Sequence, residues 1–259
     1  MRIATWNVNS IRTREDRVLV WLEENAPDVI CMQETKTVDD AFPRDGFEAL
    51  GYQLATYGQP TYNGVAIASK LPIEDVAIGL PLNGDEDARG IAATIGGVRI
   101  AGLYVPNGRR LDAEHYQYKL KWLDALRDWL VEHCDPSQPL VLAGDFNIAP
   151  DDRDVHDPTE REGTVMNSEA VRTRFQRLLD WGLTDSLRAT TDKAGIYTWW
   201  DYRAGAFRFN KGLRIDLMLV TEPIQSRIEA VTTNRDDRKV RKGVEKPSDH
   251  IPVVLDLAD

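Results

Sequence analysis

The sequence predicts one domain of mixed α/β class, with two β-sheets packed together and helices outside them. Many short apolar runs are separated by Gly, Pro, Asn and Asp, whereas few segments have helical spacing. No internal repeat or Pro/Gly/Ser linker divides the 259 residues. Because strands outnumber helices and each must bury one face, two packed sheets flanked by helices are favoured. The domain is expected to span residues 1–259.

The first elements form a strand–helix–strand unit. The apolar segment RIATWNV at residues 2–8 predicts a strand, and DVICMQE at 28–34 predicts the next. Between them, Asn9 or Ser10 can cap a helix that ends at the NAP sequence of residues 25–27. The buried stripe of this helix contains Val18, Trp21 and Leu22.

Five short strands are expected between residues 52 and 105, where breaker residues suggest antiparallel hairpins and meanders. Their sequences are YQLATY, GVAIAS, EDVAIGL, IAATIG and VRIAGLYV. A long helix is then predicted, with Asp112 as its cap. Its buried stripe comprises Tyr116, Leu120, Leu123, Leu126 and Leu130.

The second half returns to strands. LVLAGDFN at residues 140–147 predicts a strand, and the polar segment Asp151 to Met166 predicts a long surface loop. A helix is expected from about Ser168. Its inward residues are Val171, Phe175, Leu178 and Leu179. The last predicted strands are RIDLMLV, SRIEAVTTN and IPVVLDL.

The net charge of −10 argues against a polyanionic partner when taken alone. The charge is unevenly distributed, because residues 197–250 hold 11 basic and eight acidic residues. This net of +3 is equally consistent with a solvated surface and with a binding face. The two cysteines, Cys31 and Cys134, fit a reducing cytosol. No leader or long apolar stretch is present, so we expect a cytoplasmic protein without membrane contact.

Polar side chains stand at the ends of apolar runs that ought to be buried. They are Asn7, Glu34, Asp145, Asn147, Asp216, Asp249 and His250. One such residue is most simply a cap or turn, but several together imply a shared polar site at a sheet edge. Within LVLAGDFNIAP, residues two apart share a strand face, so Asp145 and Asn147 are expected to point together.

The residue types at these positions indicate a metal-assisted hydrolysis. Carboxylate and amide oxygens without thiolates suit a hard divalent cation, Mg²⁺ or Mn²⁺. His250 is placed to donate to a phosphate oxygen or to act as a base, with Asp216 to orient it. The sequence contains no phosphate-binding G-x-x-x-x-G-K, no G-x-S-x-G and no C-x-x-C motif. Direct attack of water on a phosphate ester is therefore the favoured chemistry.

Six motifs occur in an order that resembles the endonuclease/exonuclease/phosphatase superfamily. They are TWNVNS, QETK, LYVPNG, GDFNIAP, RIDLML and PSDHIPV. Within the superfamily, the chain is most similar to the exonuclease III type of apurinic/apyrimidinic (AP) endonuclease. The resemblance covers almost the whole chain. It implies a four-layered α/β sandwich and Mg²⁺-dependent hydrolysis of DNA phosphodiesters.

The resemblance also implies roles for individual residues. Glu34 would be the principal metal ligand, with Asn7 and Asp249 assisting. Asp145 would position and deprotonate the attacking water, and Asn147 would hold that water or the transition-state oxygens. The predicted metal site comprises Asn7, Glu34, Asp145, Asn147, Asp249 and His250. The predicted catalytic residues are Tyr104, Asp145, Asn147, Asp216 and His250, with Tyr104 and Asn107 contacting the phosphate. Asn9 stands where some relatives carry an acid, so weaker assistance is expected there.

The segment YTWWDYRAGAFRFNKGLRID favours a nucleic-acid substrate within the superfamily, because aromatic and basic residues alternate in it. Trp200 and Tyr202 fit a core and a stacking platform equally well. By resemblance, Trp199, Leu213 and Ile215 would line a small apolar pocket for a flipped, baseless sugar. Arg109, Arg110 and residues in the run Arg235 to Lys246 could reach the duplex.

The leading hypothesis is a monomeric DNA-repair hydrolase that nicks duplex DNA 5′ to abasic sites and trims 3′ ends. One alternative is a phosphatase of the same superfamily, acting on a small or lipid phosphate. A second alternative is a non-catalytic binding module, which predicts gaps among the catalytic positions; none of these positions is missing.

Overall fold

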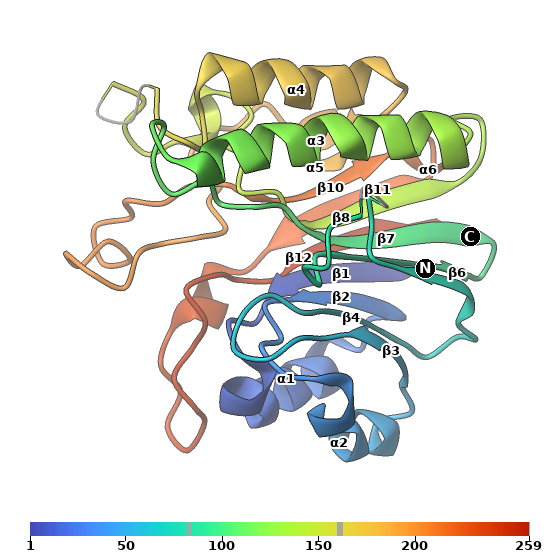
Figure 1. The fold of residues 1–259 in the computed structure, drawn as a ribbon. Helices are drawn as coiled ribbons and strands as arrows, with labels where there is room; N and C mark the ends of the chain where they lie inside the picture. Colours follow the sequence, from blue (N-terminus) through green and yellow to red (C-terminus); the bar gives the residue numbers. More distant parts are fainter. Residues whose placement is uncertain (82–83, 160–162, 259) are drawn as a thin grey trace.

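Two six-stranded sheets lie face to face between two layers of helices in the computed structural model (Figure 1). The structure describes residues 1–81, 84–159 and 163–258. Helices α3 and α4 cover one sheet, and α1 and α2 cover the other (Figure 1). The predicted fold class, two packed mixed sheets flanked by helices, is therefore confirmed.

The first sheet has the strand order β11-β12-β1-β2-β4-β3. Its strands are β1 (Arg2–Asn7), β2 (Val29–Gln33), β3 (Gln53–Tyr57), β4 (Val65–Ser69), β11 (Ile228–Thr233) and β12 (Val253–Leu257). The second sheet has the order β5-β6-β7-β8-β10-β9. Its strands are β5 (Glu74–Ile78), β6 (Gly90–Ile95), β7 (Val98–Tyr104), β8 (Leu140–Asp145), β9 (Thr184–Asp185) and β10 (Asp216–Val220).

The α-helices are α1 (Ile11–Asn25), α2 (Arg44–Ala49), α3 (Glu114–His133), α4 (Glu169–Asp180), α5 (Ser186–Thr190) and α6 (Glu222–Gln225). Short 3₁₀ helices occupy Asp39–Ala41, Asp152–Asp154 and Arg235–Arg238. The predicted apolar stripe of α3 is buried throughout. No pattern in the sequence predicted α2, α5, α6 or β9, because elements this short lack a measurable period.

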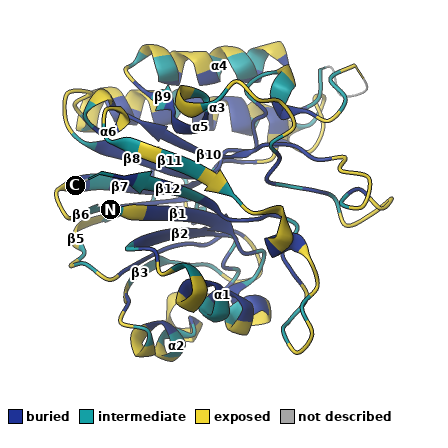
Figure 2. Cartoon of the chain, turned by 180° about the vertical axis from the view of Figure 1, so that it is seen from behind, coloured by how far each residue is buried: buried dark blue, intermediate teal, exposed yellow. Residues whose placement is uncertain are grey.

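The core between the sheets is built from β-branched and small side chains of both inner faces. Ile3, Ile67, Ile100 and Met218 belong to it. Figure 2 shows the central strands of both sheets as buried, with exposure on helices, loops and edge strands such as β11. Such a core holds the two sheets in a fixed relation, so strand ends from both can meet reproducibly.

The strand register brings the predicted polar residues to one end of the sandwich. β1 runs parallel to β2 and pairs Asn7 with Gln33, the residue before Glu34. β7 runs parallel to β8 and pairs Tyr104 with Asp145. β10 runs antiparallel to β8, so its first residue, Asp216, lies opposite Asp145. This end lies opposite the chain termini in Figure 1.

Two predicted helix caps are wrong. Ala113, not Asp112, precedes α3, and no side chain caps this helix. Asp112 instead pairs with Arg110. Ser10 precedes α1 at φ +85° and makes no capping bond with its side chain. The backbone amides at the start of α1 bond instead to carbonyls after β2, since Ile11 N–H donates to Thr35 O over 3.1 Å.

The orientation predicted for the Asn147 side chain assumed that the strand continues to residue 147, but the strand ends earlier. β8 stops at Asp145, and Asn147 has φ +51°. The chain therefore turns before Asn147, and strand alternation does not orient its side chain. Phe146, between Asp145 and Asn147, is fully buried beneath α3.

The segment Asp151 to Met166 was predicted to be a surface loop, but part of it is buried. Asp154 ends a short 3₁₀ helix and is 0% exposed. Its carboxylate accepts hydrogen bonds from Arg214 over 2.6 and 3.0 Å and also binds Arg188. Buried charges must be paired, so this ion network fixes the segment against β10. Residues 160–162 of the segment lie outside the described residues.

Gly144 lets β7 and β8 approach. A Cβ at this position would lie 1.9 Å from the carbonyl oxygen of Leu103, which is backbone and cannot move aside. We expect Gly144→Ala to lower the free energy of unfolding by about 3 kcal/mol, as overpacking does. At Gly97, which has φ +78° and open space, alanine should cost about 1 kcal/mol from backbone strain alone. Urea unfolding of both variants tests this, and equal costs would contradict it.

Candidate active site

The amide of Asn7 joins two carboxylates from different sheets. Its Nδ2 donates to Glu34 Oε1 over 2.8 Å and to Asp145 Oδ2 over 2.9 Å. Asn7 and Asp145 are buried, at 0% and 1% exposure, while Glu34 is partly exposed. Lys36 forms an ion pair with Glu34 Oε2 over 2.7 Å. The structure thus brings together Asn7, Glu34 and Asp145, as predicted from their strand-end positions.

His250 lies between two aspartates. Its Nδ1 is 2.9 and 3.0 Å from the carboxylate oxygens of Asp216. Its Nε2 is 3.8 Å from Asp145 Oδ2. Ser248 Oγ donates to Asn7 O over 2.7 Å and accepts from His250 N–H over 3.2 Å, which fixes the segment before β12. Asp216 therefore orients the imidazole of His250, and the Nε2 atom of His250 faces the space beside Asp145.

Burial and neighbouring charges shift the titration of these groups. Burial lowers the pKa of His250, but Asp216 and Asp145 outweigh it and raise that pKa to about 10. Burial raises the pKa of Asp145 to about 7, aided by Asp216 and Glu34 and opposed by His250. Although burial opposes it, Lys36 and Asn7 lower the pKa of Glu34. At neutral pH the histidine is thus a cation and Glu34 an anion.

Glu34 and Asp145 can hold a metal ion together, and His250 could join them only in its neutral form. One ligand atom from each of Glu34, Asp145 and His250 lies within 4.8 Å of the others. Two of the donors are carboxylate oxygens, which suit a hard divalent cation. A cation there would also compensate the buried negative charge of Asp145. The donor set therefore fits a divalent metal.

Asp249 lies at the edge of this group. Its Oδ1 accepts from Asn9 Nδ2 over 2.8 Å, and its Oδ2 accepts from Trp199 Nε1 over 3.0 Å. Asn9 also accepts a bond from Lys36 Nζ over 2.7 Å. Asp249 therefore connects to the Glu34 side of the site through Asn9 and Lys36, neither of which was a predicted site residue. Its role as a metal ligand stays a prediction.

Asn147 faces the loop that follows β7. Its Oδ1 accepts from Asn107 Nδ2 over 2.9 Å, and its Nδ2 donates to Val105 O over 3.0 Å. Its backbone N–H donates to Asp145 Oδ1 over 2.9 Å. Burial, aided by the charges of Glu34 and Asp145, raises the pKa of the Tyr104 hydroxyl well above its usual value. The predicted phosphate contacts thus adjoin the carboxylates, but the roles of these residues stay predictions.

The predicted apolar pocket residues form a cluster. Leu213 and Ile215 pack with Ala149 and Val155, and Trp199 covers them while remaining partly exposed. The Trp199 ring centroid lies 6.5 Å from that of His250. The cluster therefore adjoins the catalytic group, and its role in substrate binding stays a prediction.

Lys119 is a buried lysine that no local pattern predicted, and burial lowers the pKa of its ammonium group to about 7. It is 0% exposed, and its Nζ donates to the carbonyls of Asn107, Asn147 and Val165 over 3.2, 2.6 and 2.8 Å. Three acceptors match the three N–H donors of an ammonium group. Lys119 therefore ties together the loops that carry Asn107 and Asn147. The only signal in the sequence is that Lys119 falls on the apolar face of α3, next to Leu120.

A groove of about 600 Å³ opens beside the group. Its lining includes Tyr62, Arg89, Tyr104, Asn107 and Arg109. Arg89 lies over the Tyr104 ring at 5.1 Å and pairs with Asp87. Both Arg109 and Arg110 were predicted to reach a DNA duplex. Arg109 is exposed and lines the groove, whereas Arg110 does not line it and pairs with Asp112.

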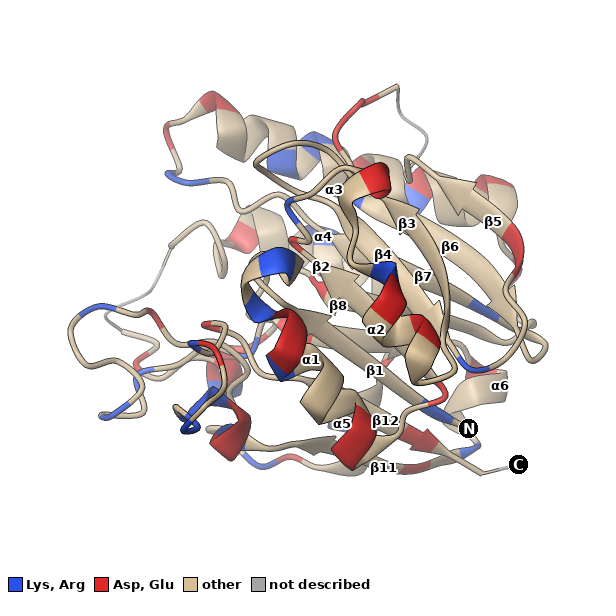
Figure 3. Ribbon diagram, turned by 90° about the horizontal axis from the view of Figure 1, so that it is seen from below, with Lys and Arg blue, Asp and Glu red and all other residues tan. Residues whose placement is uncertain are grey.

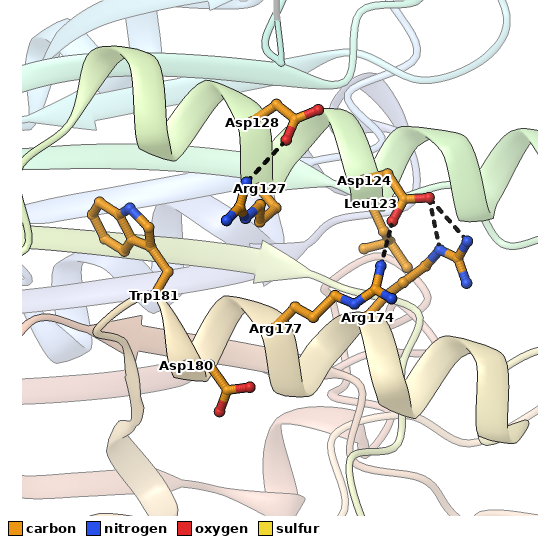
Figure 4. A pocket seen from close by; sticks show the side chains of 8 residues that line it. All are labelled: Leu123, Asp124, Arg127, Asp128, Arg174, Arg177, Asp180 and Trp181. Carbon is orange, nitrogen blue, oxygen red and sulfur yellow. Dashed lines mark hydrogen bonds and ion pairs between the residues drawn. The ribbon is translucent and has the colours of Figure 1, made fainter.

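A second cleft, of about 580 Å³, lies between α3 and α4 on the outside of the sandwich (Figure 4). Its arginines bind the acids of the same cleft: Arg174 and Arg177 pair with Asp124, and Arg127 pairs with Asp128. The charges within these pairs compensate one another. None of the predicted site residues lines the cleft. The groove beside Tyr104 is therefore the candidate substrate site.

Comparison with known proteins agrees with this geometry. The model of the endonuclease/exonuclease/phosphatase family matches residues 4–250. The chain belongs to this family. Exodeoxyribonuclease III of Haemophilus influenzae is 34% identical over 266 residues, which cover 98% of each protein.

Solved structures of family members share the fold. An AP endonuclease from Archaeoglobus fulgidus is 40% identical, with a TM-score of 0.94 and 99% of each chain covered. A 3′ phosphatase from Neisseria, bound to a product DNA hairpin, is 40% identical with a TM-score of 0.95, covering 100% of this chain and 99% of that one. The predicted resemblance and the hydrolytic nuclease class are confirmed. In the described part of the chain, no helix has the length and apolar character needed to span a membrane.

Asp145 should make the stability of the metal-free protein depend on pH. Its folded pKa of about 7 lies above the unfolded value of about 3.9. The folded protein therefore binds this proton more tightly, and its stabilising effect is lost as pH rises from about 4 to about 7. In EDTA, Asp145→Asn should remove this fall in the free energy of unfolding between about pH 4 and pH 7, measured by urea unfolding. Asp180→Asn, at an exposed site on α4, should keep it. A wild-type slope in Asp145→Asn would refute the assignment.

Replacing Lys119 should loosen two loops of the site. Lys119→Met leaves three carbonyls without their donor, so we expect the free energy of unfolding to fall by about 3 kcal/mol. Hydrogen exchange should also speed up at residues 105–109 and 147–149. Lys121→Met, at an exposed position on the same helix, is the matched control. Equal effects of both variants would show that the buried ammonium has no such role.

Proposed function

We propose that this protein is a Mg²⁺-dependent DNA-repair phosphodiesterase. It cleaves duplex DNA 5′ to abasic sites and removes nucleotides or blocking groups from 3′ ends. The observation that carries the proposal is the grouping of Glu34 and Asp145 with a histidine that Asp216 orients. The similarity to exodeoxyribonuclease III, an AP endonuclease and a 3′ phosphatase supports the substrate class.

Glu34 and Asp145 would hold the metal ion, with Asn7 between them. When bound, Mg²⁺ neutralises charge on the phosphate and lowers the pKa of a bound water. Asp145 accepts the proton of the attacking water, since it is buried at the centre of the group, 3.8 Å from His250 Nε2, and burial raises its pKa to about 7. Glu34 keeps its negative charge because Lys36 and Asn7 lower its pKa.

His250 acts as a donor to the scissile phosphate rather than as the base. Its pKa of about 10 keeps it protonated at neutral pH, and its Nε2 faces Asp145. A cation at this point stabilises the negative charge that develops on the phosphate oxygens. Tyr104 and Asn107 line the groove beside the site, Asn147 bonds to Asn107, and all three would contact the phosphate.

The apolar cluster of Trp199, Leu213 and Ile215 would receive the baseless sugar beside the phosphate. A site with no base to unpair is flipped at a lower cost than a normal nucleotide. The protein would work as a cytoplasmic monomer. The free thiols of Cys31 and Cys134 fit a reducing compartment, and one chain supplies the whole group of side chains.

Three labelled duplexes test the proposal: one with an abasic site, one 3′-recessed, and one ending in a 3′-phosphate. With Mg²⁺ we expect cleavage or trimming of these substrates, and with EDTA none. Asp145→Asn should lower kcat by about 10³-fold while duplex binding is retained, because it removes the proton acceptor. Asp180→Asn is the control on α4.

Full activity of Asp145→Asn would overturn the assignment of the base. A wild-type protein that leaves all three duplexes intact, yet releases phosphate from a small or lipid monoester, would favour the phosphatase alternative.

A further inference from the structure

The loop from Lys239 to Lys246 projects from the same end of the sandwich as the candidate site and leads into Asp249 and His250. We call residues 240–243 of this loop its tip. There, Val240 is 78% exposed, more than any other large hydrophobic residue in the described part of the chain. Cationic residues flank it at Lys239, Arg241 and Lys242. A single exposed valine is ordinary on a mobile loop, so the significance of Val240 depends on how the loop is held.

Helix α1 binds both arms of this loop through one buried guanidinium. Arg17 is 4% exposed and donates to the carbonyls of Asp237, Lys239 and Glu245 over 2.8, 2.5 and 3.1 Å. These carbonyls lie on either side of the tip, so Arg17 holds the two arms together. Trp21 Nε1 adds a bond of 3.2 Å to the Asp237 carboxylate. The tip is therefore presented in a fixed shape, at a low entropic cost of binding.

The aromatic segment Tyr197 to Phe209 fixes the other side of the loop. Arg238 lies 4.6 Å above the Tyr202 ring, and Lys246 lies 4.8 Å from it. The Tyr202 hydroxyl donates to Pro247 O over 2.8 Å. Arg238 is buried and its ring contact contributes to folding, whereas Lys246 is exposed and keeps its charge beside the Tyr202 ring.

Ion pairs within the protein leave few basic residues of this loop free to bind a polyanion. Lys239 pairs with Asp236, and Arg241 pairs with Glu24. Lys242 is exposed and has no ion-pair partner among the residues that the structure describes. The tip thus offers one uncompensated cation two residues from one exposed apolar side chain. Figure 3 shows Lys and Arg recurring along the loops at this end of the molecule.

We propose that the tip of this loop grips duplex DNA outside the cleaved bond, with Lys242 on a phosphate and Val240 against the neighbouring sugars. The proposal rests on the proposed function. Duplex DNA is the favoured partner because residues 197–250 carry a net of +3 on a chain of −10, and because the loop continues directly into the site residues. Alternating phosphates and apolar sugar faces match a lysine beside a valine.

Lys242→Ala and Val240→Ser test this, with binding measured against salt on an abasic duplex that extends at least about ten base pairs to either side. Lys242→Ala should weaken binding several-fold and flatten the slope of log K against log salt by about 0.9, the value of one phosphate contact. Val240→Ser should weaken binding about fivefold with the salt slope kept, since it removes apolar contact only. In turnover, both should act on KM more than on kcat.

The matched controls are Lys121→Ala and Val131→Ser, at exposed positions on α3. Wild-type affinity in both loop variants, or equal losses in the controls, would overturn the role of the loop while the proposed function stands. A wild-type protein that binds no duplex would overturn both. Melting temperatures of the four variants should equal that of the wild type, since all four side chains are exposed.

Discussion

The bonds of the Asn7 amide to Glu34 and Asp145 are the interaction on which the site depends. Two carboxylates brought this close, with Asp216 nearby, repel one another in a medium of low dielectric. The chain offsets this with a neutral donor between the acids and with cations around them, His250 and Lys36. Each compensating group comes from a different strand end, so both sheets must be in register before the acids can be tolerated.

Backbone conformation adds a second constraint at the same place. Glu34, Lys36 and Asn147 have φ of +52°, +53° and +51°, in the left-handed region that favours glycine. Each costs of order 1–2 kcal/mol and persists only where surrounding contacts enforce it. The backbone of Asn147 is held by Lys119, and that of Lys36 by a bond of 2.9 Å from its N–H to Asn63 O. Rigid packing beneath the site thus sustains a local geometry that the isolated segments would not adopt.

The sequence predicted the strands and the polar residues at their ends because both leave local patterns. Asp216 and His250 could be paired in advance from their motifs, and the structure brings them together. Buried cations escaped prediction. Arg17, Lys119 and Arg214 bind carbonyls or carboxylates that lie 12 to 228 residues away, and no local pattern records such partners. The cap of α1 failed for a related reason, since the carbonyls of Glu34 and Thr35 accept the bonds that a polar side chain was expected to accept.

The first and last strands of the chain are neighbours, since β1 pairs with β12, and the Trp6 indole donates to the carbonyl of His250 over 3.2 Å. The site therefore joins residue 7 to residue 250, almost the full length of the chain. Contacts this distant in sequence form late in folding. During synthesis, the pair of Asp216 and His250 cannot form until residue 250 has emerged, so the candidate site is assembled from both ends of the described chain at once.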